Sequence, residues 1–175
     1  MAVLRTRRLE LIPLTAEQLE LYLSDPPALE TVLRVPVSRA ILTEPVQRAI
    51  RAKLELLLSL DPELHPWLTY WLVVVTAASF GAGLIGFKGV PDVFGQVEVG
   101  YGIDPAYGRK GYTTEAVQRL IAWAFGDPAC KAVLARNIDP ANWASLRVAA
   151  KAGMVAYEES ETGISLRIDR APSRS

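Results

Sequence analysis

Residues 101–125 read YGIDPAYGRKGYTTEAVQRLIAWAF, and this stretch decides the fold class because it joins an alternating segment to an amphipathic helix through a Gly-rich turn. The turn holds Gly108 and Gly111, with Arg109 and Lys110 between them. The first turn of a helix presents unpaired N–H groups and a partial positive charge, so a flexible, basic turn at that place can bind an anion. The same residues could also form only a tight connection whose basic side chains are solvated.

The segment before this turn, residues 95–103, alternates with the period of a β-strand. That period places Glu98, Gly100 and Gly102 on one face and the apolar residues on the other. A glycine inside a strand often marks the close approach of a ligand or of another backbone. The strand pattern alone leaves two readings open: a ligand beside this face, or a solvent-facing carboxylate with two glycines at a bend.

The rest of the chain predicts one mixed α/β domain over residues 1–175, with a mostly antiparallel sheet of about seven strands and about four flanking helices. Thr15 and Gln18 form a capping box that begins the first helix. Asp139 and Pro140 are suited to begin the last helix. Strands are predicted at residues 8–14, 70–76, 83–90, 95–103, 131–136, 154–159 and 164–169, and the other helices at 44–60, 113–125 and 139–153.

Composition and charge exclude several classes of function. Hydrophobic residues make up 50% of the chain, and 19 basic residues balance 19 acidic ones, which argues against disorder and against a general nucleic-acid binder. With Cys130 as its single cysteine and His65 as its single histidine, the chain cannot form an intrachain disulfide or a Cys/His zinc site. We predict no bound metal. Because no segment resembles a signal peptide or a membrane span, we expect a cytoplasmic protein that does not bind membranes.

Two quoted stretches, VEVGYGIDPAYGRKGYTTEAVQRLIAWAF and NIDPANWASLRVAAKAGM, resemble the GNAT acetyltransferase superfamily. They are most similar to the branch of ribosomal-protein N-terminal acetyltransferases. The resemblance is specific over about residues 83–155 and weaker over the N-terminal LRTRRLELIPLTAEQL. It implies a sheet whose fourth and fifth strands splay apart, with an acyl-CoA lying in the gap.

The pyrophosphate motif of that family, Q/R-x-x-G-x-G/A, falls on residues 108–113. Only the central glycine, Gly111, matches, so the resemblance supports contacts from the backbone N–H groups rather than from a side chain at the first position. Gly108 stands where the family has Gln or Arg, and Thr113 stands where it has a small residue. The resemblance assigns acetyl-CoA contacts to Ile103, Gly108, Arg109, Lys110, Gly111, Tyr112, Thr113, Thr114, Asn137 and Asn142.

The resemblance also implies two catalytic residues. Many members carry a tyrosine that protonates the departing thiolate, and that place falls on Ala149 here. In the ribosomal-protein branch the serine of an Asn-x-x-Ser motif takes this role, which makes Ser145 the candidate acid. The alternative is a serine whose hydroxyl bonds to its own helix. Glu98 matches a position at which members often carry the general base.

The implied reaction is direct attack by a primary amine on the thioester of acetyl-CoA, without a metal. The acceptor is a peptide N-terminus or a small-molecule amine, expected near residues 25–67 and 157–163. The sequence is compatible with a homodimer. Two alternatives stay open: an acyl-CoA-binding sensor or regulatory module without catalysis, and an interaction domain without a CoA site. The presence of two motifs in the expected order and spacing disfavours the interaction domain.

Overall fold

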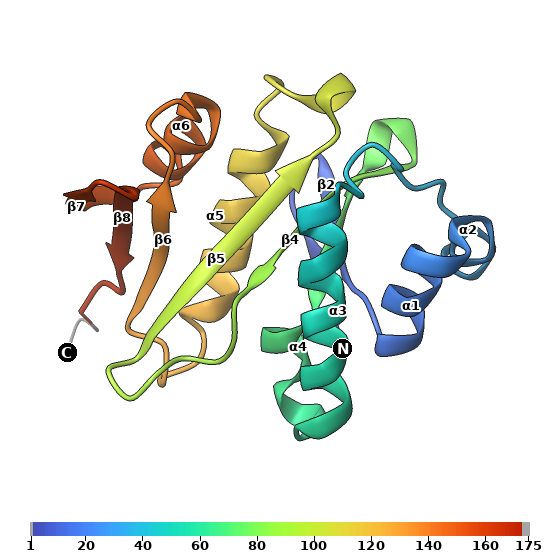
Figure 1. Cartoon of the computed structure of the whole chain (residues 1–175), viewed down its shortest axis with the longest axis horizontal. Coiled ribbons are helices and arrows are strands. Elements are labelled where there is room, and N and C mark those ends of the chain that lie inside the picture. The colour runs from blue at the N-terminus through green and yellow to red at the C-terminus, as the bar shows by residue number, and fades with distance from the viewer. Residues whose placement is uncertain (1, 173–175) are drawn as a thin grey trace.

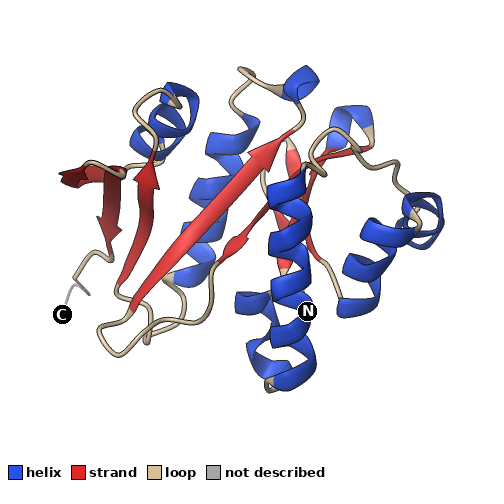
Figure 2. Cartoon of the chain, in the orientation of Figure 1, coloured by secondary structure: helices blue, strands red, loops and turns tan. Residues whose placement is uncertain are grey.

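The computed structural model describes residues 2–172 and shows one eight-stranded sheet with the strand order β1-β2-β3-β4-β5-β6-β8-β7 (Figures 1 and 2). Among the eight strands of the described residues, only β5 and β6 pair in parallel, and all other neighbouring strands are antiparallel. The strands are β1 (Leu4–Arg5), β2 (Leu9–Pro13), β3 (Tyr70–Val75), β4 (Phe80–Phe87), β5 (Gln96–Ile103), β6 (Ala132–Ile138), β7 (Val155–Ser160) and β8 (Gly163–Asp169).

Among these residues the chain forms six α-helices, and three short 3-10 turns lie between other elements. The helices are α1 (Ala16–Ser24), α2 (Pro26–Leu33), α3 (Glu44–Ser59), α4 (His65–Leu68), α5 (Tyr112–Ala124) and α6 (Trp143–Lys151). The predicted capping box of α1 is confirmed, since Thr15 Oγ1 accepts from Gln18 N and Gln18 Oε1 accepts from Thr15 N. Within residues 2–172 no helix has both the length and the hydropathy needed to cross a bilayer.

The predicted splay lies between β5 and β6. Their parallel pairing extends only from Gln96 to Glu98 on one strand and from Ala132 to Leu134 on the other. Beyond that point the strands diverge, as Figure 1 shows, and α5 crosses behind the opening. The carboxyl ends of the two strands, where a ligand would enter an open sheet, therefore lie apart.

The sheet separates two hydrophobic clusters. On one face Val97 and Val99 of β5 pack with α5 residues such as Leu120. On the other face Leu84 of β4 packs with residues of α1, α2 and α3, including Ile50. The burial of Val97 and Val99 confirms the period-two reading of β5 and leaves Glu98, Gly100 and Gly102 toward the α3 side.

The structure differs from the sequence prediction at several boundaries. The two-residue strand β1 and the helix α4 were not predicted, and α2 lies in the segment 25–43, for which the sequence predicts only loop with a short helix. These elements explain the eight strands and six helices in place of about seven and about four. The strand predicted over residues 83–90 is β4, which is shifted toward the N-terminus and ends at Phe87. Helix α6 begins at Trp143 with Asn142 as its N-cap, not at Asp139, because the Asp139 carboxylate accepts from Ala141 N and closes a separate turn.

Candidate active site

A cavity of about 360 Å³, here called the α5–α6 cavity, opens beside the end of β5, between the N-terminal part of α5 and helix α6. It collects residues from the strand, from the turn after it and from both helices, so it occupies the splay. Its lining consists of Tyr101, Gly102, Ile103, Tyr107, Gly108, Arg109, Gly111, Tyr112, Thr113, Thr114, Trp143, Ala144, Ser145, Arg147, Val148 and Lys151.

The backbone at the start of α5 is shaped for an anion. Arg109 and Gly111 both have left-handed φ values, 59° and 80°, and Gly111 is the N-cap of α5 without a side-chain cap. None of the amides of residues 109–114 has a protein hydrogen-bond acceptor among residues 2–172. Six successive unpaired donors at a helix N-terminus form an anion-binding surface, and several of these residues line the cavity.

Basic side chains add positive charge to the same cavity. Arg109 comes from the turn, and Arg147 and Lys151 come from α6, one helical turn apart. Lys110 is turned away: its Nζ donates to the carbonyl of Ala106 at 3.1 Å and lies over the ring of Tyr107. The cavity can therefore hold several negative charges without Lys110.

Tyr101 connects the strand to α6 across the splay. Its hydroxyl donates to the carbonyl oxygen of Ser145 at 2.9 Å, and burial raises the pKa of Tyr101 to about 12. The phenol therefore stays protonated at neutral pH and remains a donor. This bond fixes the distance between β5 and the first turn of α6 at the inner end of the cavity.

Ser145 lines the cavity, and its amide donates to Asn142 Oδ1 at 3.2 Å. Within the part of the chain that the structure describes, its hydroxyl makes no hydrogen bond to the protein. The alternative of a hydroxyl bonded to its own helix is therefore not what the structure shows, and the group is free to contact a ligand in the cavity.

Seven of the ten residues predicted to contact the cofactor line this cavity: Ile103, Gly108, Arg109, Gly111, Tyr112, Thr113 and Thr114. The other three, Lys110, Asn137 and Asn142, do not. Asn142 caps α6, and Asn137 has a left-handed φ of 51° and accepts from Thr162 Oγ1 at 3.0 Å. Asn142 therefore contacts the backbone of α6, and Asn137 contacts the turn between β7 and β8; neither asparagine lines the cavity.

The sequence reasoning missed the α6 side chains in the cavity. Ala144, Arg147, Val148 and Lys151 follow the spacing of one helical face, so the helical period of this segment could have identified them. Trp143, which is 62% exposed, also lines the cavity. Of the α6 residues that line the cavity, only Ser145 belongs to the Asn-x-x-Ser motif.

A second cavity of about 300 Å³, here called the α3 cavity, lies on the other side of the end of β5. It shares Tyr101, Gly102 and Ile103 with the α5–α6 cavity, so the two meet at this strand end. A Cβ placed on Gly102 would meet no atom within 4 Å, which shows that the missing side chain leaves open space. The remaining lining is Ala40, Ile41, Thr43, Val46, Tyr70, Leu84 and Pro105.

The aromatic residues between positions 67 and 71 divide into two groups. Trp67 and Trp71 are buried and pack against Trp123 of α5, with ring centroids 4.7 and 5.4 Å away, so they belong to the core. Tyr70 lines the α3 cavity, and its ring lies 4.7 Å from Nζ of the buried Lys53. Lys53 also donates to the carbonyls of Leu68 and Phe87, and burial lowers its pKa to about 8.

Glu98 lies on the face of β5 that carries Gly100 and Gly102, as predicted, but it lines neither cavity. Its carboxylate forms an ion pair with Lys88 at the end of β4. Gly102 is four residues further along β5, roughly 13 Å at the usual rise of a strand. Glu98 therefore lies away from the strand end at which the two cavities meet.

Comparison with known proteins assigns the family. Residues 8–155 match the model of the acetyltransferase (GNAT) domain, so the chain belongs to the GNAT acetyltransferase family.

Among its relatives is an uncharacterized N-acetyltransferase, YjdG, from Bacillus subtilis (strain 168), which is 32% identical over 90 residues, or 51% of this chain. That match spans only 53% of the relative.

Solved structures share the fold over nearly the whole chain. The ribosomal-protein-S5-alanine acetyltransferase from Vibrio fischeri aligns over 100% of both chains, with a TM-score of 0.68 and 19% identity. RimL, a ribosomal L7/L12 α-N-protein acetyltransferase solved in complex with coenzyme A, aligns over 96% of this chain and 98% of its own, with a TM-score of 0.67 and 14% identity. At these identities the likeness establishes the fold alone.

Proposed function

We propose that this chain is an acetyl-CoA-dependent N-acetyltransferase that acts as a single domain. The observation that supports this most is the pair of cavities meeting at Tyr101, Gly102 and Ile103, with the unpaired amides of the α5 N-terminus in one of them. In this proposal the α5–α6 cavity holds acetyl-CoA and the α3 cavity holds the amine, so the two substrates approach the end of β5 from opposite sides.

The chemistry of the α5–α6 cavity suits coenzyme A. The pyrophosphate would accept from the amides of residues 109–114, and Arg109, Arg147 and Lys151 would balance the phosphate charges. The apolar part of the lining, which includes Ile103 and Val148, suits the pantetheine arm leading toward β5. The Tyr101 bond to α6 keeps this route open at its inner end.

The lining of the α3 cavity favours a small, uncharged group beside the acceptor amine. Its walls are mostly aliphatic, with Thr43 and Tyr70 supplying hydroxyls, and no carboxylate lies among the lining residues. A peptide N-terminus with a small first residue fits this chemistry better than a polycationic amine does. The structural relatives that act on ribosomal proteins make protein N-termini the first acceptors to test.

The proposed reaction needs one proton acceptor and one proton donor. The amine nitrogen attacks the thioester carbonyl, a C–N bond forms, the C–S bond breaks, and the amine loses a proton. An α-amine with a pKa of roughly 8 is partly neutral at pH 7, and a leaving thiol with a pKa of about 8.5 needs modest help. We assign the donor role to the unpartnered hydroxyl of Ser145, and positioning supplies much of the remaining rate.

Glu98 stays the proposed base, acting through water. The strand face between Glu98 and the α3 cavity carries only glycines, and a Cβ on Gly100 would meet nothing nearer than Lys88 Cε at 4.0 Å. This open strip gives room for ordered water that could relay a proton from the amine to the carboxylate. Glu98 would not touch the amine directly in this arrangement.

The proposal is tested by incubating the protein with acetyl-CoA and a panel of N-terminal peptides and small amines, with free thiol release as the readout. We expect release above the hydrolysis background with a subset of the panel. Thermal stabilisation by acetyl-CoA without any thiol release would instead support the sensor. No stabilisation at millimolar acetyl-CoA would contradict both, because a ligand that binds only the folded state must stabilise it.

A further inference from the structure

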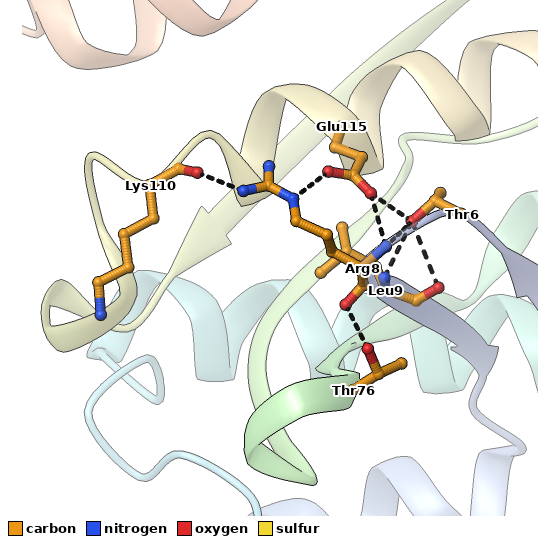
Figure 3. A network of polar contacts seen from close by, with 6 residues as sticks. All are labelled: Thr6, Arg8, Leu9, Thr76, Lys110 and Glu115. Atoms are coloured by element: carbon orange, nitrogen blue, oxygen red, sulfur yellow. Dashed lines mark hydrogen bonds and ion pairs between the residues drawn. The ribbon is translucent and has the colours of Figure 1, made fainter.

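A polar network joins the N-terminal segment to the start of α5 (Figure 3). Thr6 and Arg8 lie between β1 and β2, more than 100 residues from Glu115 in the sequence. Thr6 Oγ1 donates to Glu115 Oε1 at 2.6 Å, the amide of Arg8 donates to the same oxygen at 3.0 Å, and Arg8 Nε donates to Oε2 at 2.7 Å. One carboxylate therefore fixes both the backbone and the guanidinium of Arg8.

The other end of the Arg8 guanidinium reaches the phosphate turn. Arg8 Nη1 donates to the carbonyl oxygen of Lys110 at 3.0 Å, and Arg8 Cζ lies 4.7 Å from the centroid of the Tyr112 ring. The backbone of Arg8 is itself held, since its carbonyl accepts from the amide and hydroxyl of Thr76. Glu115 and Thr76 thus hold Arg8 in place, and its remaining guanidinium contact is with the Lys110 carbonyl.

The Lys110–Gly111 peptide is trans and planar, so its carbonyl and its N–H point in opposite directions. A hydrogen bond that fixes the Lys110 carbonyl toward Arg8 therefore fixes the Gly111 N–H away from Arg8. Gly111 lines the α5–α6 cavity, whereas Lys110 and Arg8 do not, which favours a Gly111 N–H directed into the cavity. Arg8 does not line the cavity, so it orients the Gly111 N–H from the opposite side of the peptide.

We propose that Arg8 is a positioning residue that orients the Gly111 N–H, and with it the phosphate turn, toward the pyrophosphate of the cofactor. This inference rests on the proposed use of acetyl-CoA. The turn contains two left-handed residues, Arg109 and Gly111, and no side chain caps α5, so little within the turn itself holds this conformation. Arg8 supplies the missing restraint from a distant part of the chain.

The choice of an arginine follows from this geometry. Nε contacts Glu115 while Nη1 contacts Lys110, and only a planar fork reaches both partners at once. Glu115 neutralises the guanidinium: burial opposes its ionisation, but hydrogen bonds from Thr6 and Arg8 lower its pKa overall. A lysine at this position could keep the charge and one contact, but it could not hold both groups.

The test compares Arg8→Ala and Arg8→Lys with Arg5→Ala. Arg5 is a matched control, since its side chain is 71% exposed and pairs only with Glu10, outside both cavities. Calorimetric titration measures the affinity for CoA, which contains the pyrophosphate. Thermal shift with millimolar pantetheine reports binding of the arm alone. We expect both Arg8 variants to bind CoA about tenfold more weakly than wild type, with Arg5→Ala within about twofold. We expect the pantetheine shift to be equal in all four proteins.

Three results would overturn the proposal. One is CoA binding by the Arg8 variants within twofold of Arg5→Ala. Another is a smaller thermal shift with pantetheine in the Arg8 variants alongside weaker CoA binding, which would show general damage to the domain. A third is full recovery of CoA affinity in Arg8→Lys, which would show that only the charge matters. If wild type and Arg5→Ala themselves fail to bind CoA, the proposed function fails first and the role of Arg8 fails with it.

Discussion

The two cavities on either side of β5 are built in different ways. The α5–α6 cavity depends on backbone amides from one continuous stretch, with α6 added as a second wall. The α3 cavity depends on side chains from four separated parts of the chain: residues 40–46, Tyr70, Leu84 and residues 101–105. Side chains around the α5–α6 cavity can therefore vary without loss of its amide donors, whereas almost any substitution in the lining changes the α3 cavity. Under the proposed function, the cofactor site would tolerate sequence change better than the acceptor site.

The largest expected effect comes from filling the α3 cavity. Gly102→Leu places a side chain into open space on the face shared with Glu98, so the fold should tolerate it. We expect acetyl transfer to fall about 1000-fold or more, because the amine can no longer reach its place at the strand end. Thiol release measures the transfer, and calorimetry measures CoA affinity.

The matched control for Gly102→Leu is Ala129→Leu, which introduces the same side chain at an exposed position outside both cavities. It should retain activity within a few-fold. Wild-type turnover in Gly102→Leu would show that the acceptor does not occupy the α3 cavity, and the comparison between the two cavities would lose its functional meaning.

Glu98→Gln is expected to lower turnover by about 100-fold, as the loss of a general base does. The pH dependence of kcat/KM should change shape, and CoA affinity should stay unchanged because Glu98 lies outside the α5–α6 cavity. Glu10→Gln removes the carboxylate of another ion pair of the sheet and serves as the control. Equal activity of Glu98→Gln and wild type across pH would exclude Glu98 as the base.

Ser145→Ala tests the cofactor side with a smaller expected effect. Its hydroxyl lines the α5–α6 cavity, while its amide and carbonyl serve Asn142 and Tyr101 and survive the substitution. We expect kcat to fall about tenfold, since a thiolate leaves without much assistance. An unchanged kcat at saturating acetyl-CoA and acceptor would remove Ser145 from the mechanism.

Lys53, beside Tyr70, gives the acceptor side a pH dependence of stability. Burial lowers its pKa from 10.5 to about 8, so the protonated form is disfavoured in the folded state. The associated stability is complete above pH 10.5 and is lost as pH falls through 8. Relative to Lys53→Met, wild type should therefore gain about 3 kcal/mol between pH 7.5 and pH 10.5. Urea unfolding of both proteins checks this, and parallel curves for the two would contradict it.

The features that the sequence predicted are local in the chain. The capping box of Thr15, the face of β5 that carries Glu98, and the turn around Gly111 each depend on residues within a few positions of one another. Local period and turn chemistry determine such features, which is why they agree with the structure. The splay of β5 and β6 came instead from the family resemblance.

The features that the sequence did not predict depend on distant contacts. Arg8 reaches Lys110 across 102 positions, and no local pattern indicates that pairing. Lys88 forms an ion pair with Glu98 because the antiparallel pairing of β4 and β5 places the two residues opposite each other. The walls of the α3 cavity come from segments whose meeting depends on the packing of α3 on the sheet. The four-residue helix α4 is too short for a helical period to identify.

Titration of CoA into wild type, Gly111→Ala and Gly89→Ala tests the central claim most directly. Gly111 and Gly89 have φ values of 80° and 133°, so an alanine strains the backbone at either position. Gly111 lines the α5–α6 cavity, and its Cβ would lie 3.3 Å from Arg8 Nη2, whereas Gly89 lies outside both cavities and therefore controls for backbone strain. We predict that wild type and Gly89→Ala bind CoA equally and that Gly111→Ala binds it about 30-fold more weakly. Equal affinity in all three proteins would contradict a cofactor site built from the backbone at the start of α5.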